Sequence, residues 1–525
     1  MRKLLNIIGL SAAVLLTSCD MDKIPQGSLD QGEAFKDLKT VEYLANGAYA
    51  RLRDNYGIEN MILPDIQADY VNALSGYSNT YGEVYKWIFT QNDYDVTAAW
   101  EVCYMTIAQC NFIIDGIDKN IDNFKPKDQP ALDLINGRMF LMRAMSYSML
   151  AERFCADYNA ATATKEFSGV PIIPNYNPDE KPSRATLAQV YDAILADIAQ
   201  AKVYLKKTAG SPSAIYLNID CVTALEARVY LQMDKYPEAL AAANSLINNG
   251  KYALATSLDE FDDVWTYDRG KEVIFKFAAS KTELPPAYGG SFFSEGYGGA
   301  GAADGVYYWS VDYIPTQDVV DMYDKDDYRG KSWIYMAKTT SDFNSQCWAG
   351  GDYLITPGFA LISKFAGNPD LRTSNAWNFR NTWKVFRIAE MYLIAAEAAA
   401  QSGGDAATPL NALRTHRGLK ALTSVTMADV KTERYKEMML EGTRLTDLKR
   451  WGDGFKRGIS QVGTFNKFNN LMGTVTPEKE DALAILAART LDAKAGDFHF
   501  VWPIPYNEIY ANQNLKGQQN PGWEK

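Results

Sequence analysis

The chain is poor in histidine, with only His416 and His499 among its 525 residues. Histidine is the usual acid–base group at neutral pH and the commonest metal ligand in proteins. Neither of the two has a plausible nucleophile or ligand pattern beside it in sequence. No CxxC motif or cluster of cysteine and histidine suggests zinc. We therefore expect no histidine- or cysteine-bound metal and no cofactor. Calcium stays open as an alternative because carboxylates and carbonyl-rich loops are plentiful, although no contiguous ligand motif supports it.

Cysteines are few and scattered. After Cys19 the chain has five: Cys103, Cys110, Cys155, Cys221 and Cys347. An odd, widely spaced set does not resemble a disulfide framework. Cys103 and Cys110 are seven positions apart in a helical pattern, which favours core residues over ligands.

Acidic residues outnumber basic ones, 64 to 53. The formal net charge is −11 and the isoelectric point is near 5.0. Nucleic-acid binding requires clustered Lys and Arg that displace counterions, so we expect no nucleic-acid partner. The composition, 47% hydrophobic and 22% charged, is that of a globular protein with ample core.

Long apolar runs are missing except at the N-terminus. Arg2 and Lys3 precede an apolar run from Leu4 to Leu16, which is too short to span a bilayer but suits a signal-peptide core. The run ends in Leu16-Thr17-Ser18-Cys19, which resembles a bacterial lipobox. We expect residues 1–18 to be a signal peptide, Cys19 to carry lipid and residues 19–24 to be a tether. Lipid would then be the only membrane anchor.

Apolar residues at helical spacing dominate the rest of the N-terminal half. They predict helices over 40–53, 98–118 and 131–154. A capping box, Thr186-x-x-Gln189, opens a further helix in which apolar residues recur every three or four positions as far as Leu205.

Two helix pairs indicate a repeat architecture. In 218–249, small residues and Tyr230 on one helix precede a second helix that starts at Tyr236-Pro237, a layout that resembles a tetratricopeptide repeat. The segment 385–418 repeats it, with Gly403-Gly404 as the stop and Thr408-Pro409 as N-cap and first residue of the second helix. Strand-like runs at 273–279, 354–365 and 498–504 are short. The predicted fold is mainly α: a tetratricopeptide-like helical-repeat scaffold with long irregular loops and minor short β-strands.

One insert, Pro285–Tyr335, is both glycine-rich and aromatic. It has seven glycines between Gly289 and Gly305, and 12 aromatic residues from Tyr288 to Tyr335. The glycines argue against a regular element, and so many rings are hard to bury completely. We expect an irregular loop whose rings form a binding surface.

A second aromatic loop runs from Asp69 to Tyr94. Because the apolar face of a sugar ring stacks on Trp or Tyr while polar groups bond its hydroxyls, both loops suit a glycan. The candidate ligand-binding residues are Tyr77, Tyr81, Trp87, Tyr297, Tyr307, Trp309, Trp333 and Trp348. We expect rings from the two loops to converge on one face.

A row of carboxylates, Glu433, Glu437 and Glu441, shares one face of a predicted helix. A carboxylate pair is what glycoside hydrolysis requires. Four basic residues lie close by in sequence, namely Arg434, Arg444, Lys449 and Arg450. This favours a structural ion-pair network over a catalytic pair.

The C-terminal half carries a family pattern. The pattern runs through Arg387-Ile-Ala-Glu390-Met-Tyr392, Leu410-Asn411-Ala-Leu-Arg414, Glu433-Arg434-x-x-Glu437-x-x-x-Glu441-Gly442-x-Arg444-x-x-Asp447-Leu448-Lys449-Arg450-Trp451 and Trp502-Pro503-Ile504-Pro505. It resembles the signature of the SusD/RagB family, and Arg143-Ala144, Gly169-Val170-Pro171 and Cys19 fit the same family upstream. Leu445-Thr446 and His416 depart from it.

The resemblance implies a single SusD-like unit over 25–525. Its N-terminal helical part would cover about 25–250, and its C-terminal part about 270–525 with a loop-rich insert at 285–383. The resemblance also implies a lipoprotein exposed on the cell surface of a Gram-negative outer membrane, with a SusC-type TonB-dependent transporter as partner. Family members capture oligosaccharides, some take peptides, and they are not enzymes.

We therefore expect a surface lipoprotein that binds glycan and delivers it to the transporter. The alternatives are a peptide receptor of the same architecture, a surface glycosidase with two carboxylates facing each other at the aromatic loops, and an assembly scaffold that grips proteins.

Overall fold

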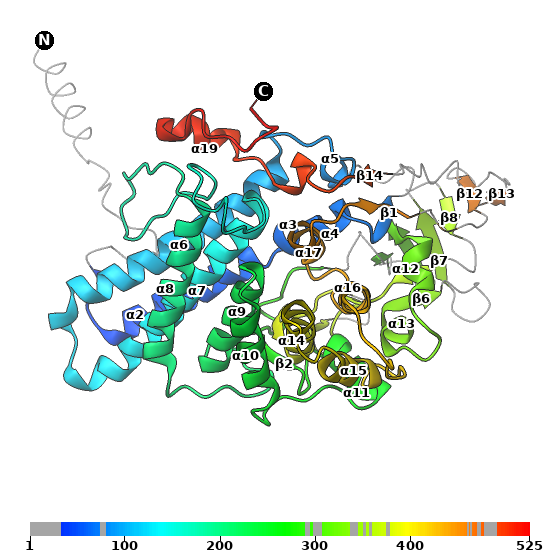
Figure 1. Cartoon of the computed structure of the whole chain (residues 1–525), viewed down its shortest axis with the longest axis horizontal. Helices are drawn as coiled ribbons and strands as arrows, with labels where there is room; N and C mark the ends of the chain where they lie inside the picture. The colour runs from blue at the N-terminus through cyan, green and yellow to red at the C-terminus, as the bar shows by residue number, and fades with distance from the viewer. Residues whose placement is uncertain are drawn as a thin grey trace, which may run out of the picture.

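A computed structural model describes residues 33–73, 80–288, 295–297, 307–336, 345–349, 353–355, 360–373, 378–458, 461, 465–469, 474–476 and 491–524, in several short strands by their backbone alone. Within these ranges most of the regular structure is helical, as predicted (Figure 1).

The N-terminal half is a row of long helices. They are α2 (Leu38–Asn55), α6 (Tyr94–Lys119), α7 (Gln129–Phe154) and α8 (Leu187–Leu205). α6 packs against α2 and α7, and α7 packs in turn against α8 (Figure 1). All four predicted helices are confirmed, because an apolar stripe at helical spacing has to be buried against a neighbour.

The row continues into the C-terminal half. It consists there of α9 (Ile219–Gln232), α10 (Tyr236–Ile247), α14 (Ile388–Ser402), α15 (Ala407–Thr415) and α16 (Met427–Glu437). α10 packs against both α9 and α14, so it joins helices that are about 150 residues apart in sequence. Buried Ala239 and Ala243 on α10 permit this close packing. The tetratricopeptide-like prediction is confirmed.

Helix ends follow the sequence signals with one exception. Thr186 and Gln189 form the predicted capping box of α8, and Gly403 ends α14 with a φ of +75°. The prediction that Thr408 caps α15 is wrong. The helix begins at Ala407, and the carboxylate of Asp405 accepts hydrogen bonds from the backbone N–H groups of Ala407 and Thr408 at 2.9 and 3.1 Å. A carboxylate three residues upstream thus satisfies the free N–H groups first.

Short helices connect these elements. They are α3 (Ile58–Met61), α4 (Leu63–Gln67), α5 (Gly82–Tyr85), α11 (Leu258–Thr266), α12 (Gln317–Asp321), α13 (Tyr328–Trp333), α17 (Arg444–Trp451) and α19 (Tyr506–Ala511), with 3₁₀ turns at Ile121–Asn123, Pro126–Asp128, Pro369–Leu371, Phe498–Phe500 and Gln513–Leu515.

The aromatic insert is not irregular throughout. Its strands β3 (Glu295–Tyr297) and β4 (Tyr307–Val311) belong to one sheet with four strands that follow the insert in sequence. These are β7 (Ser345–Ala349), β8 (Tyr353–Ile355), β12 (Phe465–Asn469) and β13 (Thr474–Thr476), and the order in the sheet is β13-β12-β8-β7-β4-β3. Only the β4–β7 pair among these is parallel. The expectation of a wholly irregular loop is wrong, because β3 and β4 of the insert pair with each other and β4 also pairs with β7, which lies after the insert in sequence.

Four two-stranded ladders complete the described strands. They pair β1 (Val71–Ala73) with β5 (Tyr313–Pro315), β2 (Val273–Lys276) with β10 (Lys384–Arg387), β6 (Ile334–Met336) with β9 (Ala360–Ile362), and β11 (Phe455–Lys456) with β14 (Asp492–Ala493). The strand-like run 273–279 is therefore confirmed in part by β2. The run 354–365 divides between β8 and β9, and 498–504 contains a 3₁₀ turn instead of a strand.

One hydrophobic core extends along the helical row as far as Trp523. Cys103, Cys110, Cys155 and Cys221 are buried in it as free thiols, as the sequence predicted for the first two. Among the residues that the structure describes, no helix is long and apolar enough to cross a membrane.

Candidate functional site

The two aromatic segments of the sequence lie side by side. β1, from the first segment, pairs antiparallel with β5 of the insert, with Asn72 opposite Ile314. The rings of Tyr85 and Tyr313 make an edge contact at 5.4 Å between centroids, and the Tyr313 hydroxyl donates a 2.5 Å hydrogen bond to the carbonyl of Thr80. Tyr85 and Tyr313 are buried, so this junction is core and not binding surface.

A tight turn at α5 shapes the exposed side of the first segment. Tyr81 and Trp87, on either side of this helix, have φ values of +54° and +59°. Such left-handed conformations cost roughly 1–3 kcal/mol in residues other than glycine, and they persist where the surroundings hold them. After the turn the chain alternates: Trp87 and Phe89 point into the core, while Ile88 is 54% exposed.

Buried aromatic rings pack against Trp87 and Phe89 of this segment. Trp87 packs edge-on against Phe455 and Phe500, and its indole N–H donates a 2.8 Å hydrogen bond to the carbonyl of Gln67. Phe89 contacts Trp523, with the ring centroids 5.0 Å apart. Ile88, the exposed residue between Trp87 and Phe89, is therefore held in place by two neighbours that are packed into the core.

The segment from Tyr81 to Asp95 lines a depression of about 330 Å³, which we call the tyrosine groove. It is lined by Tyr81, Gly82, Glu83, Ile88, Phe89, Thr90, Asn92, Asp93, Tyr94 and Asp95. Tyr94, the first residue of α6, is 75% exposed, and Tyr81 is half-buried. The groove thus offers aromatic and aliphatic surface next to hydroxyl, amide and carboxyl groups.

Acidic groups under Tyr94 set the electrostatics of the groove. Asp93 caps α6, and its carboxylate accepts hydrogen bonds from the backbone N–H groups of Asp95 and Val96 at 3.0 and 3.2 Å. Burial, together with the negative charges of Asp93 and Glu59, raises the pKa of Asp95 to about 7. The charge of Asp95 in turn raises the pKa of Tyr94. A carboxyl that is partly protonated at neutral pH both donates and accepts hydrogen bonds, which suits sugar hydroxyls.

Two of the candidate rings lie in the core. Trp87 is 7% exposed and Trp333 is fully buried. Trp333 packs edge-on against Trp265 at 5.0 Å, and the Lys364 ammonium sits 3.9 Å from its centroid. The expectation that these two rings face a ligand is wrong, because tertiary contacts cover both of them.

The other candidates are only partly visible. Tyr81 lines the tyrosine groove. Tyr77 lies outside the described residues, and Tyr297, Tyr307, Trp309 and Trp348 belong to strands β3, β4 and β7, of which the backbone alone is described. The backbone register sets Trp309 beside Gly296 and Cys347.

The sequence-based list omitted Tyr94, Ile88 and Asn92, which line the groove. A signal for Tyr94 was present in the sequence. Asp93 is a good N-cap residue, which places Tyr94 at the start of a helix. Ile88, by contrast, is recognisable only once Trp87 and Phe89 are known to be buried.

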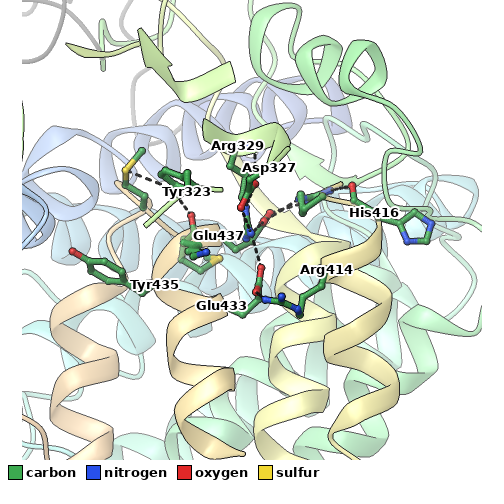
Figure 2. A network of polar contacts seen from close by, with 12 residues as sticks. Tyr323, Asp327, Arg329, Arg414, His416, Glu433, Tyr435 and Glu437 are labelled. Carbon is green, nitrogen blue, oxygen red and sulfur yellow. Dashed lines mark hydrogen bonds and ion pairs between the residues drawn. The ribbon is translucent and has the colours of Figure 1, made fainter. Parts of the chain in front are cut away.

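The glutamate row belongs to a buried ion-pair network, and Figure 2 shows its part around Glu433 and Glu437. Glu433 contacts Arg329 at 2.6 Å and Arg414 at 2.7 Å. Glu437 contacts the guanidinium groups of Arg387 and Arg417, both at 2.9 Å. Although burial opposes it, these guanidinium groups hold the pKa of Glu437 well below its ordinary value.

The predicted network is confirmed with different partners. Glu441 pairs with Arg387 and Lys364, at 2.5 and 2.7 Å, rather than with its sequence neighbours. The neighbouring bases bind elsewhere: Arg434 to Asp447, Arg444 to Asp69 and Arg450 to Glu397, while Lys449 donates to backbone carbonyls. Each glutamate of the row is committed to a cation, which leaves no carboxylate pair for hydrolysis there.

No metal-ligand cluster is present in the described part of the chain, where no three His, Cys, Asp or Glu side chains are grouped to hold an ion.

Comparison with known proteins gives two family-model matches. Residues 271–523 match the model described as the SusD family, and residues 29–231 match one described as "Starch-binding associating with outer membrane". Among curated proteins, the starch-binding protein SusD of Bacteroides thetaiotaomicron is 34% identical over 141 residues, which are 27% of this chain and 21% of that protein. The chain thus matches about a fifth of the length of this relative.

Solved structures share the fold over nearly the whole chain. A SusD superfamily protein from Bacteroides thetaiotaomicron matches with a TM-score of 0.70 and 24% identity, covering 92% of this chain and 100% of the other. A laminarin-binding SusD-like protein matches with a TM-score of 0.64 and 19% identity, covering 91% of this chain and 98% of the other.

Proposed function

Because the chain belongs to the SusD family, we propose that it binds glycan on the cell surface and delivers it to a SusC-type TonB-dependent transporter in the outer membrane. The ligand would be an oligosaccharide or polysaccharide, held without being cleaved. The relatives described as starch-binding and laminarin-binding support a glucan as the first class to test.

The observation that carries this proposal is the exposed ring of Tyr94 in the tyrosine groove. A ring that is 75% exposed at a rigid helix start offers a flat face to a pyranose. Asn92 and Thr90 stand in the same groove to bond the hydroxyls at the edge of the sugar. Rings of the insert, among them Tyr307 and Trp309, would extend this surface.

The membrane part of the proposal rests on Cys19 in the sequence Leu16-Thr17-Ser18-Cys19. Lipid on Cys19 would hold the protein at the outer membrane, because each buried methylene adds about 0.8 kcal/mol. A binder tethered beside the transporter raises the local concentration of glycan at its mouth.

Calorimetric titration of the protein that starts after Cys19 tests the proposal. The ligands are β-1,3-glucan and α-1,4-glucan oligosaccharides, with short peptides as the competing class. We expect saccharide binding that is weakened in Tyr94→Ala and retained in Tyr43→Ala. Tyr43 is a matched control because it is also an exposed tyrosine, at 55%, and lies on α2 away from the groove.

Other outcomes would identify the alternatives. Binding of peptides alone would favour the peptide receptor. Shorter sugars released during incubation would favour a glycosidase, for which Glu83 and Asp95 in the groove would be the first carboxylates to replace. Capture of proteins without either ligand would favour the assembly scaffold.

A further inference from the structure

A second and larger cavity, of about 610 Å³, lies near the C-terminal segment. Its wall comes from the loop 156–168 after α7, the first residue of α8, the end of α17 and residues 496–521. Its volume falls within the range of small-molecule sites, about 300–1,000 Å³. We call it the Phe498 cavity. The tyrosine groove does not share its lining residues.

Aromatic residues separate the two depressions. Phe89 of the groove contacts Trp523 at 5.0 Å, and Trp523 contacts Phe498 of the cavity at 4.8 Å. Trp523 therefore contacts one ring from each depression. Because the two linings share no residue, a ligand of the cavity does not have to be part of the glycan.

The apolar wall of the cavity is held in place. Phe167 has a φ of +57°, in a turn in which the Ser168 hydroxyl donates to the Lys165 carbonyl at 2.6 Å. A Cβ atom at position 522 would lie 2.5 Å from the ring of Phe498. Because Gly522 has no side chain, it leaves room for that ring. Phe167 and Phe498 are 40% and 38% exposed, which leaves ring surface for a ligand.

The side-chain amides in the wall already form hydrogen bonds within the protein. Gln518 and Asn520 both bond Arg184, and Asn520 also donates to the carbonyls of Phe154 and Trp502. Gln519 bonds the backbone of Ile504 through its oxygen and its nitrogen. These three amides are therefore not free to orient a ligand, and the ionisable side chains of the wall are the groups that remain for this.

The ionisable groups in the wall favour a cation. The wall contains four carboxylates, Asp157, Glu166, Asp453 and Asp497, and two ammonium groups, Lys165 and Lys449. Lys449 already donates to the carbonyls of Glu152 and Cys155. The carboxylate of Asp157 has no side-chain donor among the residues that the structure describes, and burial raises its pKa to about 6. It is therefore largely ionised at neutral pH. The positive charges of Lys449 and Arg450 act on it, but among the described residues neither forms an ion pair with it.

We propose that the Phe498 cavity binds a small ligand with a cationic amino group, paired with Asp157, on an apolar body that packs between Phe167 and Phe498. Such a group is found both on free amines and at the N-terminus of a peptide. The shared chemistry is an ammonium next to a hydrophobic side chain.

Ligand-observed NMR and calorimetry on the whole mature chain test this proposal with three probes of one shape. The probes are 2-phenylethylamine, 3-phenylpropanoate and 2-phenylethanol, which are cationic, anionic and neutral. We expect the amine to bind about tenfold more tightly than the alcohol and the anion not to bind. Equal binding of all three, or no binding of the amine at millimolar concentration, overturns the proposal without any variant.

Variants locate the site. Asp157→Asn should weaken the amine about tenfold and leave the alcohol unchanged, whereas Phe498→Ala should weaken both. Asp192→Asn, an exposed aspartate on α8, is the matched control. If Asp157→Asn leaves amine binding intact, the assignment is wrong.

A dipeptide amide with N-terminal phenylalanine distinguishes the sources. Binding as tight as that of the amine assigns the ligand to peptide N-termini, and its exclusion assigns the ligand to free amines. Glycan titrations of the same variants should not change, so this proposal and the glycan proposal can fail separately.

Discussion

The ammonium of Lys364 lies 3.9 Å from the centroid of the Trp333 indole, in the core of the protein. It also lies 4.2 Å from the centroid of the Trp265 ring, and it donates a hydrogen bond to the carbonyl of Met439. Burial lowers the pKa of Lys364 to about 8. A tryptophan that the sequence offered as a ligand platform therefore serves as one wall of a buried cation site.

Trp333→Ala should reduce stability and leave ligand affinity unchanged. Removing a buried indole costs about 3–5 kcal/mol, and the loss of a desolvated cation–π contact adds to it. Urea unfolding should show a lower midpoint, while calorimetry on the folded fraction gives the wild-type dissociation constant for glycan. Trp333→Phe is the control, and it should lose less stability than Trp333→Ala. A weaker glycan affinity with unchanged stability would place Trp333 back in the binding site.

Tyr94→Ala should raise the dissociation constant for glycan about tenfold. A stacked ring contributes roughly 0.5–1.5 kcal/mol beyond its buried area, and 1.4 kcal/mol is a factor of ten. Tyr94→Phe keeps the ring and should lose much less. Because Tyr94 is 75% exposed, neither change should move the unfolding midpoint by much. Equal affinities of the Ala and Phe variants would argue against stacking.

Asp95 should make stability depend on pH. Its pKa is raised from the ordinary 3.8 to about 7 in the folded protein. Between these values the folded protein holds a proton that the unfolded chain releases, so stability decreases as the pH rises through this window. After allowance for solvent screening the effect is about 1–2 kcal/mol.

Unfolding of Asp95→Asn between pH 4 and pH 8 checks this dependence. The variant should lose part of the downward slope that the wild type has across this range, whereas Asp192→Asn should keep all of it. Parallel curves for the wild type and Asp95→Asn would contradict the raised pKa.

Glu437→Gln should be among the most destabilising single changes in the chain. It leaves the buried guanidinium groups of Arg387 and Arg417 short of a counter-charge, and breaking such a pair on one side costs about 3–5 kcal/mol. The exposed pair of Lys36 and Glu33 provides the contrast. Glu33→Gln should cost less than about 1 kcal/mol. A small effect of Glu437→Gln in chemical unfolding would mean that the network is not a determinant of stability.

Cys19→Ala should release the protein from the outer membrane. Without the thiol no lipid can be attached, and the chain then lacks the acyl chains that would hold it there. Cell fractionation and the mass of the mature N-terminus are the measurements. Ser28→Ala, further along the N-terminal segment, should stay in the membrane fraction. Membrane retention of Cys19→Ala would exclude lipid on Cys19 as the anchor.

Local signals predicted the helices and failed for features that distant segments determine. The capping box of Thr186 and Gln189 lies within four residues, so it could be read directly. The pairing of β8 with β12 joins residues such as Leu354 and Asn466, and no short-range pattern encodes it. The glycines of the insert likewise concealed β3 and β4, whose sheet includes β7 from outside the insert.

Ring exposure was equally hard to predict. Trp87 and Tyr94 lie in one aromatic segment, yet Trp87 is 7% and Tyr94 75% exposed. The difference comes from Phe455 and Phe500, which cover Trp87 and belong to segments more than 350 residues away. Composition indicated an aromatic surface, but only the packing decides which rings form it.

The ion-pair network also bears on how the ligand of such a protein could change during evolution. The signature from Glu433 to Trp451 is built from residues such as Glu437 and Arg450 that face buried counter-charges, not solvent. A mutation in the tyrosine groove leaves those pairs untouched. Under the proposed function, new ligand preferences arise between Tyr81 and Asp95 without a change in the residues by which the chain is recognised. The signature then identifies the framework and not the ligand.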